Sequence, residues 1–270
     1  MTLYLASSAH NEPSGALIAL CAASVACTSL RGMCGRFALS DSVNEQITEF
    51  VTETGRRPDE WSPDWESSYS IAPTQDIPIL LDSAKSGEPR FERARWSLVP
   101  SWSKELKVKF ATHNAKAEGI LEKNTWRKPV QSHRAIIPAH GFFEWTGERG
   151  SKQPWFIHHP EGQLLGFAGL YSWWVDRTAA EDDPDRWKLT ATILTSDAVE
   201  TLEGIHDRNP VILPQHMWLH WMDPTIVGTQ ELVDEAVRAG VAEASSLTFD
   251  QVAPFKVSDN GRQLITPLPA

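Results

Sequence analysis

Short apolar segments follow one another closely between residues 77 and 195, and this feature constrains the fold most. They cover residues 77–81, 91–99, 135–137, 141–145, 155–158, 164–171 and 189–195, with turn residues at 86–87, 147–150 and 161–162. Segments of this length between glycine-containing turns are typical of strands that pair with their neighbours. We therefore expect an α+β protein, a single domain around a curved, mostly antiparallel and barrel-like β-sheet with helices at its periphery.

Helical spacing of apolar residues is found outside this region. Val43 and Ile47 recur one turn apart behind Ser42 and Glu45, which form a capping box, so residues 40–51 are predicted to be helical. Further helices are expected at residues 214–221 and 229–239, further strands at 211–213 and 247–251, and a surface loop with two tryptophans at 56–68.

The composition limits the kind of partner this chain can have. Its 270 residues carry a formal net charge of -10, with 41% hydrophobic and 22% charged residues, as in globular proteins. A negative chain is not expected to coat nucleic acid through bulk electrostatics, because proteins that do so present a basic face. Any nucleic-acid site must therefore be local, and the acidic run at residues 181–185 is expected to be a solvated loop.

All three cysteines, Cys21, Cys27 and Cys34, lie near the start of the chain and have no CxxC spacing. This pattern predicts neither a disulfide framework nor a zinc site. We expect no metal and no other cofactor. A protein body without cysteines fits a reducing compartment, so we expect a cytoplasmic location.

Residues 1–32 are expected to be an N-terminal extension, separate from a domain at residues 33–270. The apolar stretch at residues 16–30 is short for a membrane span and lacks the preceding basic cluster of a signal peptide. No membrane association is predicted. Three explanations stay open, in this order: a start codon assigned too far upstream, a pro-segment that is removed, or a weak export signal.

Cys34 lies in the segment Met33-Cys34-Gly35-Arg36-Phe37, and its chemistry depends on whether it is the first residue. An N-terminal cysteine carries an amine two carbons from its thiol. The amine can form an imine with an aldehyde, and the thiolate then closes onto the imine carbon to give a thiazolidine. An internal cysteine can give only a hemithioacetal, which reverts readily. Cys34 is therefore the candidate nucleophile of a chain that starts there.

Other polar segments are candidates for the rest of a catalytic site. Glu144 is the one carboxylate in an aromatic strand, and an inward orientation would desolvate it, which favours a role in proton transfer. Alternation along the strand gives inward and outward orientations equal weight. His206 lies beside Asp207, which can orient an imidazole, and Asn114 could hold a substrate oxygen. Both residue types are more often structural in turns.

Taken together and in order, these segments resemble the SRAP family, the SOS response-associated peptidase proteins that shield abasic sites in single-stranded DNA. Beside the Cys34 segment, the resemblance rests on Tyr69-Ser70-Ile71-Ala72-Pro73, Trp96-Ser97-Leu98-Val99-Pro100-Ser101-Trp102, Asn114-Ala115-Lys116-Ala117-Glu118, residues 138–145 and His206-Asp207-Arg208-Asn209-Pro210. One such motif alone would be weak evidence for the family, whereas the whole set in this order is specific to it.

The resemblance implies a DNA–protein crosslinking enzyme in which Cys34, once N-terminal, forms a thiazolidine with the ring-opened aldehyde of an abasic site. It implies that Asn114 positions the sugar, that Glu144 shuttles protons, and that His206 assists ring opening and reversal. It further implies DNA contacts, to phosphates or by stacking, from Arg36, Pro73, Trp102, Lys116 and Arg208. The implied partner is single-stranded DNA with abasic sites, bound by a monomer that joins the nucleoid during DNA damage.

Three positions depart from the pattern of the family. Ser70 stands where Asn is common. Lys116 stands where Arg is frequent, which keeps the charge but loses the bidentate fork that suits a phosphate. His140 replaces a frequent Asp beside the Glu144 strand, where it could change the environment of that carboxylate.

Two other functions stay open. A thiol peptidase with self-processing activity would use Cys34 with His206 and Glu144, and release of the segment before Cys34 could be such an event. A non-catalytic single-stranded DNA binder would need no cysteine. Replacing Cys34 with serine separates the crosslinking enzyme from the simple binder, because it should abolish a covalent adduct and leave binding intact.

Overall fold

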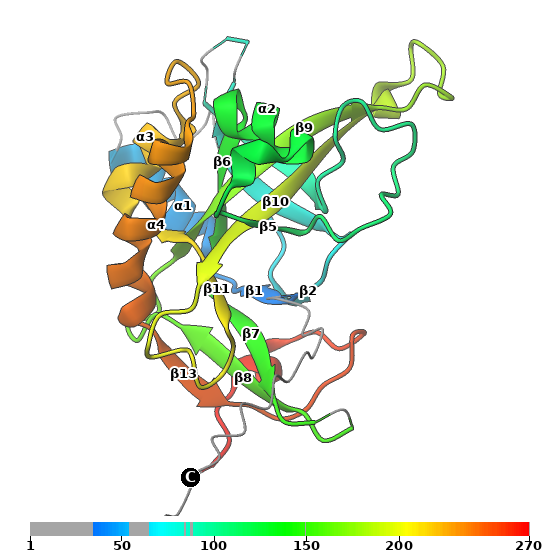
Figure 1. Cartoon of the computed structure of the whole chain (residues 1–270). Coiled ribbons are helices and arrows are strands. Elements are labelled where there is room, and N and C mark those ends of the chain that lie inside the picture. The colour runs from blue at the N-terminus through cyan, green and yellow to red at the C-terminus, as the bar shows by residue number, and fades with distance from the viewer. Residues whose placement is uncertain (1–34, 54–64, 84, 87–88, 149, 270) are drawn as a thin grey trace, which may run out of the picture. The chain divides into compact units, whose positions relative to one another are not determined.

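A computed structural model describes residues 35–53, 65–83, 85–86, 89–148 and 150–269. Cys34, the candidate nucleophile, and Trp61, one of the two tryptophans of the loop predicted at residues 56–68, lie outside these ranges. The described residues form strands β1 to β13 and α-helices α1 to α4, with short 3-10 turns between them (Figure 1).

The larger sheet closes on itself as a five-stranded barrel. The ring runs from β10 (Trp187–Asp197) to β4 (Pro89–Trp96), β3 (Asp76–Asp82), β6 (Arg134–Ala139) and β9 (Leu165–Val175), and β9 pairs with β10 again. The β4–β10 pair is parallel and the other pairs of the ring are antiparallel. Closure leaves no free edge in the ring, which is one way a curved sheet avoids unpaired strands. The predicted α+β fold around a barrel-like, mostly antiparallel sheet is confirmed.

A second, fully antiparallel sheet lies beside the barrel. Its strand order is β13 (Thr248–Gln251), β8 (Gln153–His158), β7 (Gly141–Thr146), β1 (Phe37–Leu39) and β2 (Ser68–Ile71). Strand β7 separates two cores. Phe142 packs edge-on against Phe167 of the barrel core, whereas Phe143 packs against Phe156 in a smaller cluster on the other face. Both faces of β7 are therefore buried.

The helices pack around the sheets, as Figure 1 shows. They are α1 (Val43–Glu53), α2 (Asn124–Ser132), α3 (Trp218–Met222) and α4 (Gln230–Ser245), with 3-10 turns η2 (Ile120–Glu122), η3 (Pro184–Arg186), η4 (Gln215–Met217) and η5 (Arg262–Ile265). Helix α2 packs against β9, α3 against β6, and α4 against β12 (Ile212–Leu213). The helices predicted at residues 40–51, 214–221 and 229–239 correspond to α1, to η4 with α3, and to α4.

One expectation about the loop at residues 56–68 is wrong. Trp65 is buried rather than on the surface, and the guanidinium of Arg93 lies 4.3 Å from the centre of its ring. The side-chain amide of Asn44 on α1 donates to the Trp65 carbonyl at 2.9 Å, and its oxygen accepts a hydrogen bond from the backbone amide of Trp65. The burial depends on a contact with α1, which no local pattern around Trp65 could reveal.

Arg134 at the start of β6 ties two helix ends to the barrel. Its side chain is buried, and its guanidinium donates to five backbone carbonyls, those of Val130, Gln131, Trp221, Asp223 and Ile226. These carbonyls belong to the last turns of α2 and α3 and to the loop after α3, where helices leave acceptors unpaired. The fixed charge therefore satisfies the C-terminal ends of both helices.

Candidate functional site

Strand β10 brings two distant polar segments together. The parallel strand β5 (Asn114–Lys116) places Asn114 opposite Ile193 and Lys116 opposite Thr195. On the other edge of β10, β11 (Arg208–Pro210) places Pro210 opposite Thr195. The segments that begin at Asn114 and at His206 thus flank one strand, although more than 80 residues separate them in the sequence.

Glu144 and His206 form the buried ionisable pair of this region. Glu144 is 2% exposed and His206 is 5% exposed, and Glu144 Oε2 lies 4.0 Å from His206 Nε2. The open question about Glu144 is thereby answered, because its side chain is inward. It shares the face of β7 with Phe142, and that face packs on the barrel core.

The second ring nitrogen of His206 determines which way the imidazole can pass a proton. The backbone amide of Arg208 donates to Nδ1 at 3.0 Å, so the neutral ring carries its proton on Nε2, on the side of Glu144. Asp207 Oδ1 also lies 2.9 Å from Nδ1 and is ready to accept once the ring is protonated there. Glu144 Oε2 and His206 Nε2 are beyond hydrogen-bond distance of each other, so direct proton transfer between them requires a closer approach, and Asp207 can stabilise a charged imidazole.

Arg208 links the two polar segments. Its guanidinium makes a bidentate pair with the Glu118 carboxylate at 2.9 and 2.8 Å, and it also donates to Asp197 Oδ1 and to the Thr195 carbonyl, each at 2.6 Å. Burial would raise the pKa of Glu118, but hydrogen bonds and charge from Arg208, with Lys116, outweigh burial and hold this pKa below its usual range. The sequence drew attention to Arg208 and gave no role to Glu118 or Asp197.

A phosphate bound by Arg208, as the resemblance implies, would compete with the carboxylates of Glu118 and Asp197 for the guanidinium. Among the described residues, Arg208 Nε is buried without a hydrogen-bond partner. The Asp197 side chain is 88% exposed and can move away. A phosphate would therefore have to reach Nε or displace Asp197.

Arg36 precedes β1 and is half-buried. Its Nη1 donates to Ser70 Oγ on β2 at 3.2 Å, and its Nε is buried with no partner among the residues that the structure describes. Burial lowers the pKa of Arg36 from its ordinary value. The Arg36 carbonyl accepts from the Phe143 amide at 2.9 Å, so this residue lies beside the strand that carries Glu144. The departure at Ser70 thus supplies a hydroxyl that orients Arg36.

Pro73 occupies a tight turn before β3. The Gln75 amide donates to the Ala72 carbonyl at 3.1 Å, and Thr74 has φ 77°, so the turn has proline second and a left-handed residue third, as in type II turns. Left-handed backbone is rare for a β-branched residue. Lys116 is exposed on β5, and Trp102 is 61% exposed in the loop after β4.

His140 does not contact Glu144 through any bond that the structure gives it. Its Nδ1 accepts from the Ser40 amide at 3.0 Å, and its Nε2 lies 3.1 Å from Ser42 Oγ, at the entrance of α1. Burial lowers the pKa of His140 to about 4, so the ring is neutral at neutral pH. This histidine fixes the connection between β1 and α1.

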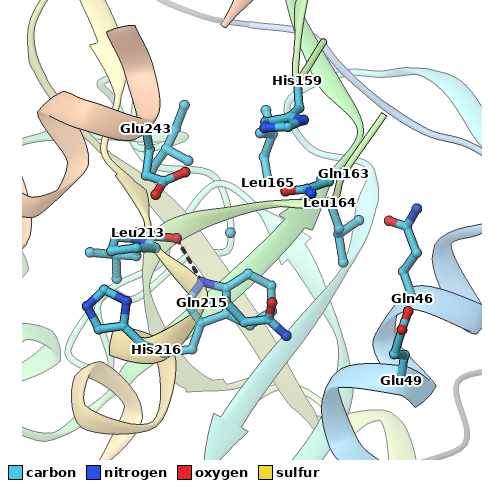
Figure 2. Close-up of a pocket in the computed structure, with 14 residues that line it drawn as sticks. Gln46, Glu49, His159, Gln163, Leu164, Leu165, Leu213, Gln215, His216 and Glu243 are labelled. Atoms are coloured by element: carbon cyan, nitrogen blue, oxygen red, sulfur yellow. Dashed lines mark hydrogen bonds between the residues drawn. The ribbon is translucent and has the colours of Figure 1, made fainter. Parts of the chain in front are cut away.

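A separate hollow of about 470 Å³ lies between α1, the start of β9, η4 and α4 (Figure 2). Its labelled side chains include Glu49, His159, His216 and Glu243, and none of the predicted site residues that the structure describes lines it. Across the described ranges, no three histidine, cysteine or acidic side chains come close enough to hold a metal ion. No helix in those ranges is long and apolar enough to cross a bilayer.

The sequence profile of the family described as SOS response associated peptidase (SRAP) matches residues 33–255. The chain belongs to the SRAP family. The match includes every segment on which the resemblance rested, and it begins at Met33, directly before Cys34.

SRAP relatives with curated names share this sequence over most of its length. The chain is 36% identical over 193 residues to "Abasic site processing protein YoqW" of Bacillus subtilis, which covers 71% of this chain and 81% of that protein. It is 30% identical over 260 residues to "Abasic site processing protein HMCES" of Gallus gallus, in an alignment that covers 83% of this chain and 74% of that protein.

Solved structures share the fold of this chain. A crystal structure of a Bacteroides thetaiotaomicron protein superposes with a TM-score of 0.66 at 20% identity and covers 87% of this chain and 100% of that one. A phage-related protein of Bordetella bronchiseptica gives a TM-score of 0.61 at 28% identity and covers 82% of this chain and 95% of that one.

Proposed function

We propose that this protein processes abasic sites in single-stranded DNA by crosslinking to them through Cys34, in the form of the chain that begins at Cys34. The observation that carries the proposal is the buried Glu144–His206 pair. Further support comes from the two relatives named as abasic site processing proteins.

Covalent geometry limits how far Cys34 can lie from the strand that carries Glu144, which supports its assignment. Cys34 precedes Arg36 by two residues, so their Cα atoms can be at most about 7 Å apart. The Arg36 carbonyl is bonded to the amide of Phe143, the neighbour of Glu144. An amine and a thiol on residue 34 would therefore meet a substrate close to the carboxylate.

The chemistry proceeds in two bond-forming steps. The α-amine of Cys34 adds to C1′ of the ring-opened deoxyribose, and loss of the carbonyl oxygen as water gives an imine. The thiolate then adds to the same carbon, and the imine nitrogen takes up a proton, which closes the thiazolidine. Glu144 accepts and returns the protons that these steps move, and His206 protonates the sugar ring oxygen for opening and assists the reverse reaction.

The remaining residues bind the strand. Asn114, next to β10, holds a sugar oxygen. Arg36 has a buried Nε without a described partner, which fits a phosphate oxygen. Lys116 and Arg208 add phosphate contacts, Pro73 shapes the pocket, and Trp102 stacks beside the lesion. The protein acts as a cytoplasmic monomer that joins the nucleoid during DNA damage, and its few phosphate contacts give a shallow salt dependence.

The test uses protein that begins at Cys34 and a single-stranded oligonucleotide with one abasic site. We expect an adduct that survives heat and denaturing electrophoresis, and none with intact DNA or with Cys34→Ser. Glu144→Gln should slow adduct formation by about 100-fold or more, as loss of a general acid–base group does. Glu148→Gln, an exposed glutamate just beyond β7, is the matched control and should react at the wild-type rate.

The second candidate is a self-processing thiol peptidase, which would use Cys34 with the same Glu144–His206 pair. This activity would release the segment before Cys34 and would cleave added peptides without DNA. An adduct formed equally well by Cys34→Ala would remove the assigned nucleophile. Peptide cleavage without any adduct would favour the peptidase.

A further inference from the structure

Trp96, the last residue of β4, packs against two segments that are far apart in the sequence. It is fully buried, and its ring makes edge-on contacts with Phe37 on β1 and with the imidazole of His113, with 5.1 and 5.8 Å between ring centres. Phe37 is three residues after Cys34, and His113 directly precedes Asn114. One side chain thus contacts both the segment of the proposed nucleophile and the segment of the proposed sugar contact.

Hydrogen bonds from the end of β4 fix the backbone directly before Asn114. Trp96 Nε1 donates to the carbonyl of His113 at 2.8 Å, and the amide of Leu98 donates to the carbonyl of Thr112 at 3.1 Å. The His113 carbonyl also accepts from a backbone amide of β10 at 3.0 Å, so both acceptor positions of this oxygen are occupied. Because β5 has only three residues, the position of Asn114 depends on these ties as well as on its pairing with β10.

The turn that contains Pro73 is bonded to the same tryptophan. The amide of Thr74 donates to the carbonyl of Trp96 at 2.6 Å, and the amide of Trp96 donates to the carbonyl of Gln75 at 2.8 Å. Three segments with proposed roles at the site therefore meet at one residue. The sequence identified Trp96 only as part of a family segment and gave it no role of its own.

The next residue, Ser97, has a strained backbone. Its φ is 154°, a conformation that a residue with a Cβ rarely adopts, and it is 8% exposed. Its amide donates to the carbonyl of Ala191 on β10 at 3.0 Å. Such strain persists only where the surroundings over-determine the backbone, and it is concentrated at functional sites. The bonds of Trp96 and Leu98 on either side supply that constraint.

We propose that Trp96 is a positioning residue that fixes Asn114 relative to Phe37, and thereby relative to the segment that begins at Cys34. The proposal rests on the proposed function, which assigns the sugar contact to Asn114 and the nucleophile to Cys34. Because Trp96 is fully buried, it acts on the reaction only through its neighbours. Its indole N–H is the decisive group, since a phenylalanine would still pack on Phe37 but would leave the His113 carbonyl with one donor fewer. A misplacement of about 1 Å at a reacting group can slow a reaction by about 100-fold.

The test compares Trp96→Phe with Trp221→Phe in protein that begins at Cys34. Trp221 is also fully buried in the barrel core, and its Nε1 donates to the carbonyls of Ala135 and Gly169 at 3.1 and 3.3 Å, neither of which is a predicted site residue. Both variants should lower the melting temperature, since each loses an indole and a buried hydrogen bond. Only Trp96→Phe should slow adduct formation on a saturating abasic oligonucleotide, by about 10- to 100-fold. The DNA concentration that gives half the maximal rate should stay near the wild-type value, because the phosphate contacts are kept.

A double-mutant cycle with Asn114→Ala tests whether Trp96 acts through Asn114. In the Asn114→Ala protein, Trp96→Phe should slow the reaction little further, because the group that it positions is already gone. A general structural effect would instead slow both proteins by the same factor. If Trp96→Phe does not fold, a tryptophan analogue with sulfur in place of the ring N–H at residue 96 keeps the shape of the indole, removes only the donor and should react as slowly.

The wild-type reaction distinguishes the two possible failures. If wild type forms the adduct but Trp96→Phe or the sulfur analogue reacts as fast as Trp221→Phe, the role of Trp96 is overturned and the crosslinking function stands. The same holds if the effects of Trp96→Phe and Asn114→Ala multiply in the double variant. If wild type forms no adduct with the abasic strand, the proposed function fails, and the role of Trp96 fails with it.

Discussion

Replacing His140 with glutamine should flatten the pH dependence of stability. The imidazole accepts a hydrogen bond from the Ser40 amide and contacts Ser42 Oγ, and burial lowers its pKa from 6.5 to about 4. Between these values the unfolded chain binds a proton that the folded chain excludes. The free energy of unfolding is therefore highest above pH 6.5 and falls as the pH is lowered towards 4.

The size of the effect follows from the shift. Each pKa unit corresponds to about 1.4 kcal/mol, so the full shift amounts to about 3 kcal/mol. Most of this loss of stability should occur at pH values well above the folded pKa, because the unfolded chain takes up its proton first as the pH is lowered. We expect the His140 contribution to fall by about 2 kcal/mol between about pH 7 and about pH 5.

Chemical denaturation at a series of pH values measures this contribution. His133, whose pKa is also lowered to about 4, adds to the slope of the wild-type protein, so the difference between wild type and His140→Gln isolates His140. Ser42→Ala is the control, because it removes a partner of the imidazole and keeps the titrating ring. Equal slopes for wild type and His140→Gln would refute the argument, whatever the variant does to stability at neutral pH.

Three other substitutions test parts of the framework. Arg134→Met should lower the free energy of unfolding by roughly 3 kcal/mol or more, because it leaves buried helix-end carbonyls unpaired. Arg127→Met, on the exposed face of α2, is its control and should lower that free energy far less in the same denaturation assay. Thr74→Asn should raise stability by about 1 kcal/mol, because asparagine tolerates the left-handed backbone; an unchanged denaturation midpoint would contradict this. Glu118→Gln should lower stability by about 1 kcal/mol or less and should slow adduct formation, which gel kinetics would detect.

Long periodic elements could be predicted from the sequence, and short ones could not. Strands β3, β9 and β10 and helices α1 and α4 have enough residues for their spacing to be recognised. The three-residue strands β1, β5 and β11 contain no pattern, because their pairing is decided by partners far along the chain. Helix α2 contains Pro129, which argues against a helix locally.

The same distinction applies to the site. Glu144 and His206 stand out in the sequence because a carboxylate among aromatic residues and a histidine beside an aspartate are chemically conspicuous. Whether Glu144 points inward could not be predicted, since that depends on β7 lying between two cores. The bidentate pair of Arg208 with Glu118 joins residues 90 positions apart, and neither segment alone indicates it.

The short strands also explain why side-chain bonds gather around this site. A three-residue strand makes few ladder hydrogen bonds, so its position depends on other ties. Arg208 on β11 is hydrogen-bonded to Glu118 in the segment after β5, and Ser70 on β2 accepts a hydrogen bond from Arg36 before β1. His140 accepts a hydrogen bond from the Ser40 amide in the turn after β1. Loss of one such tie should move one strand by a small amount while the barrel stays folded. Substitutions here should therefore slow adduct formation before they lower global stability, and the reverse order would show that these bonds serve the fold rather than the site.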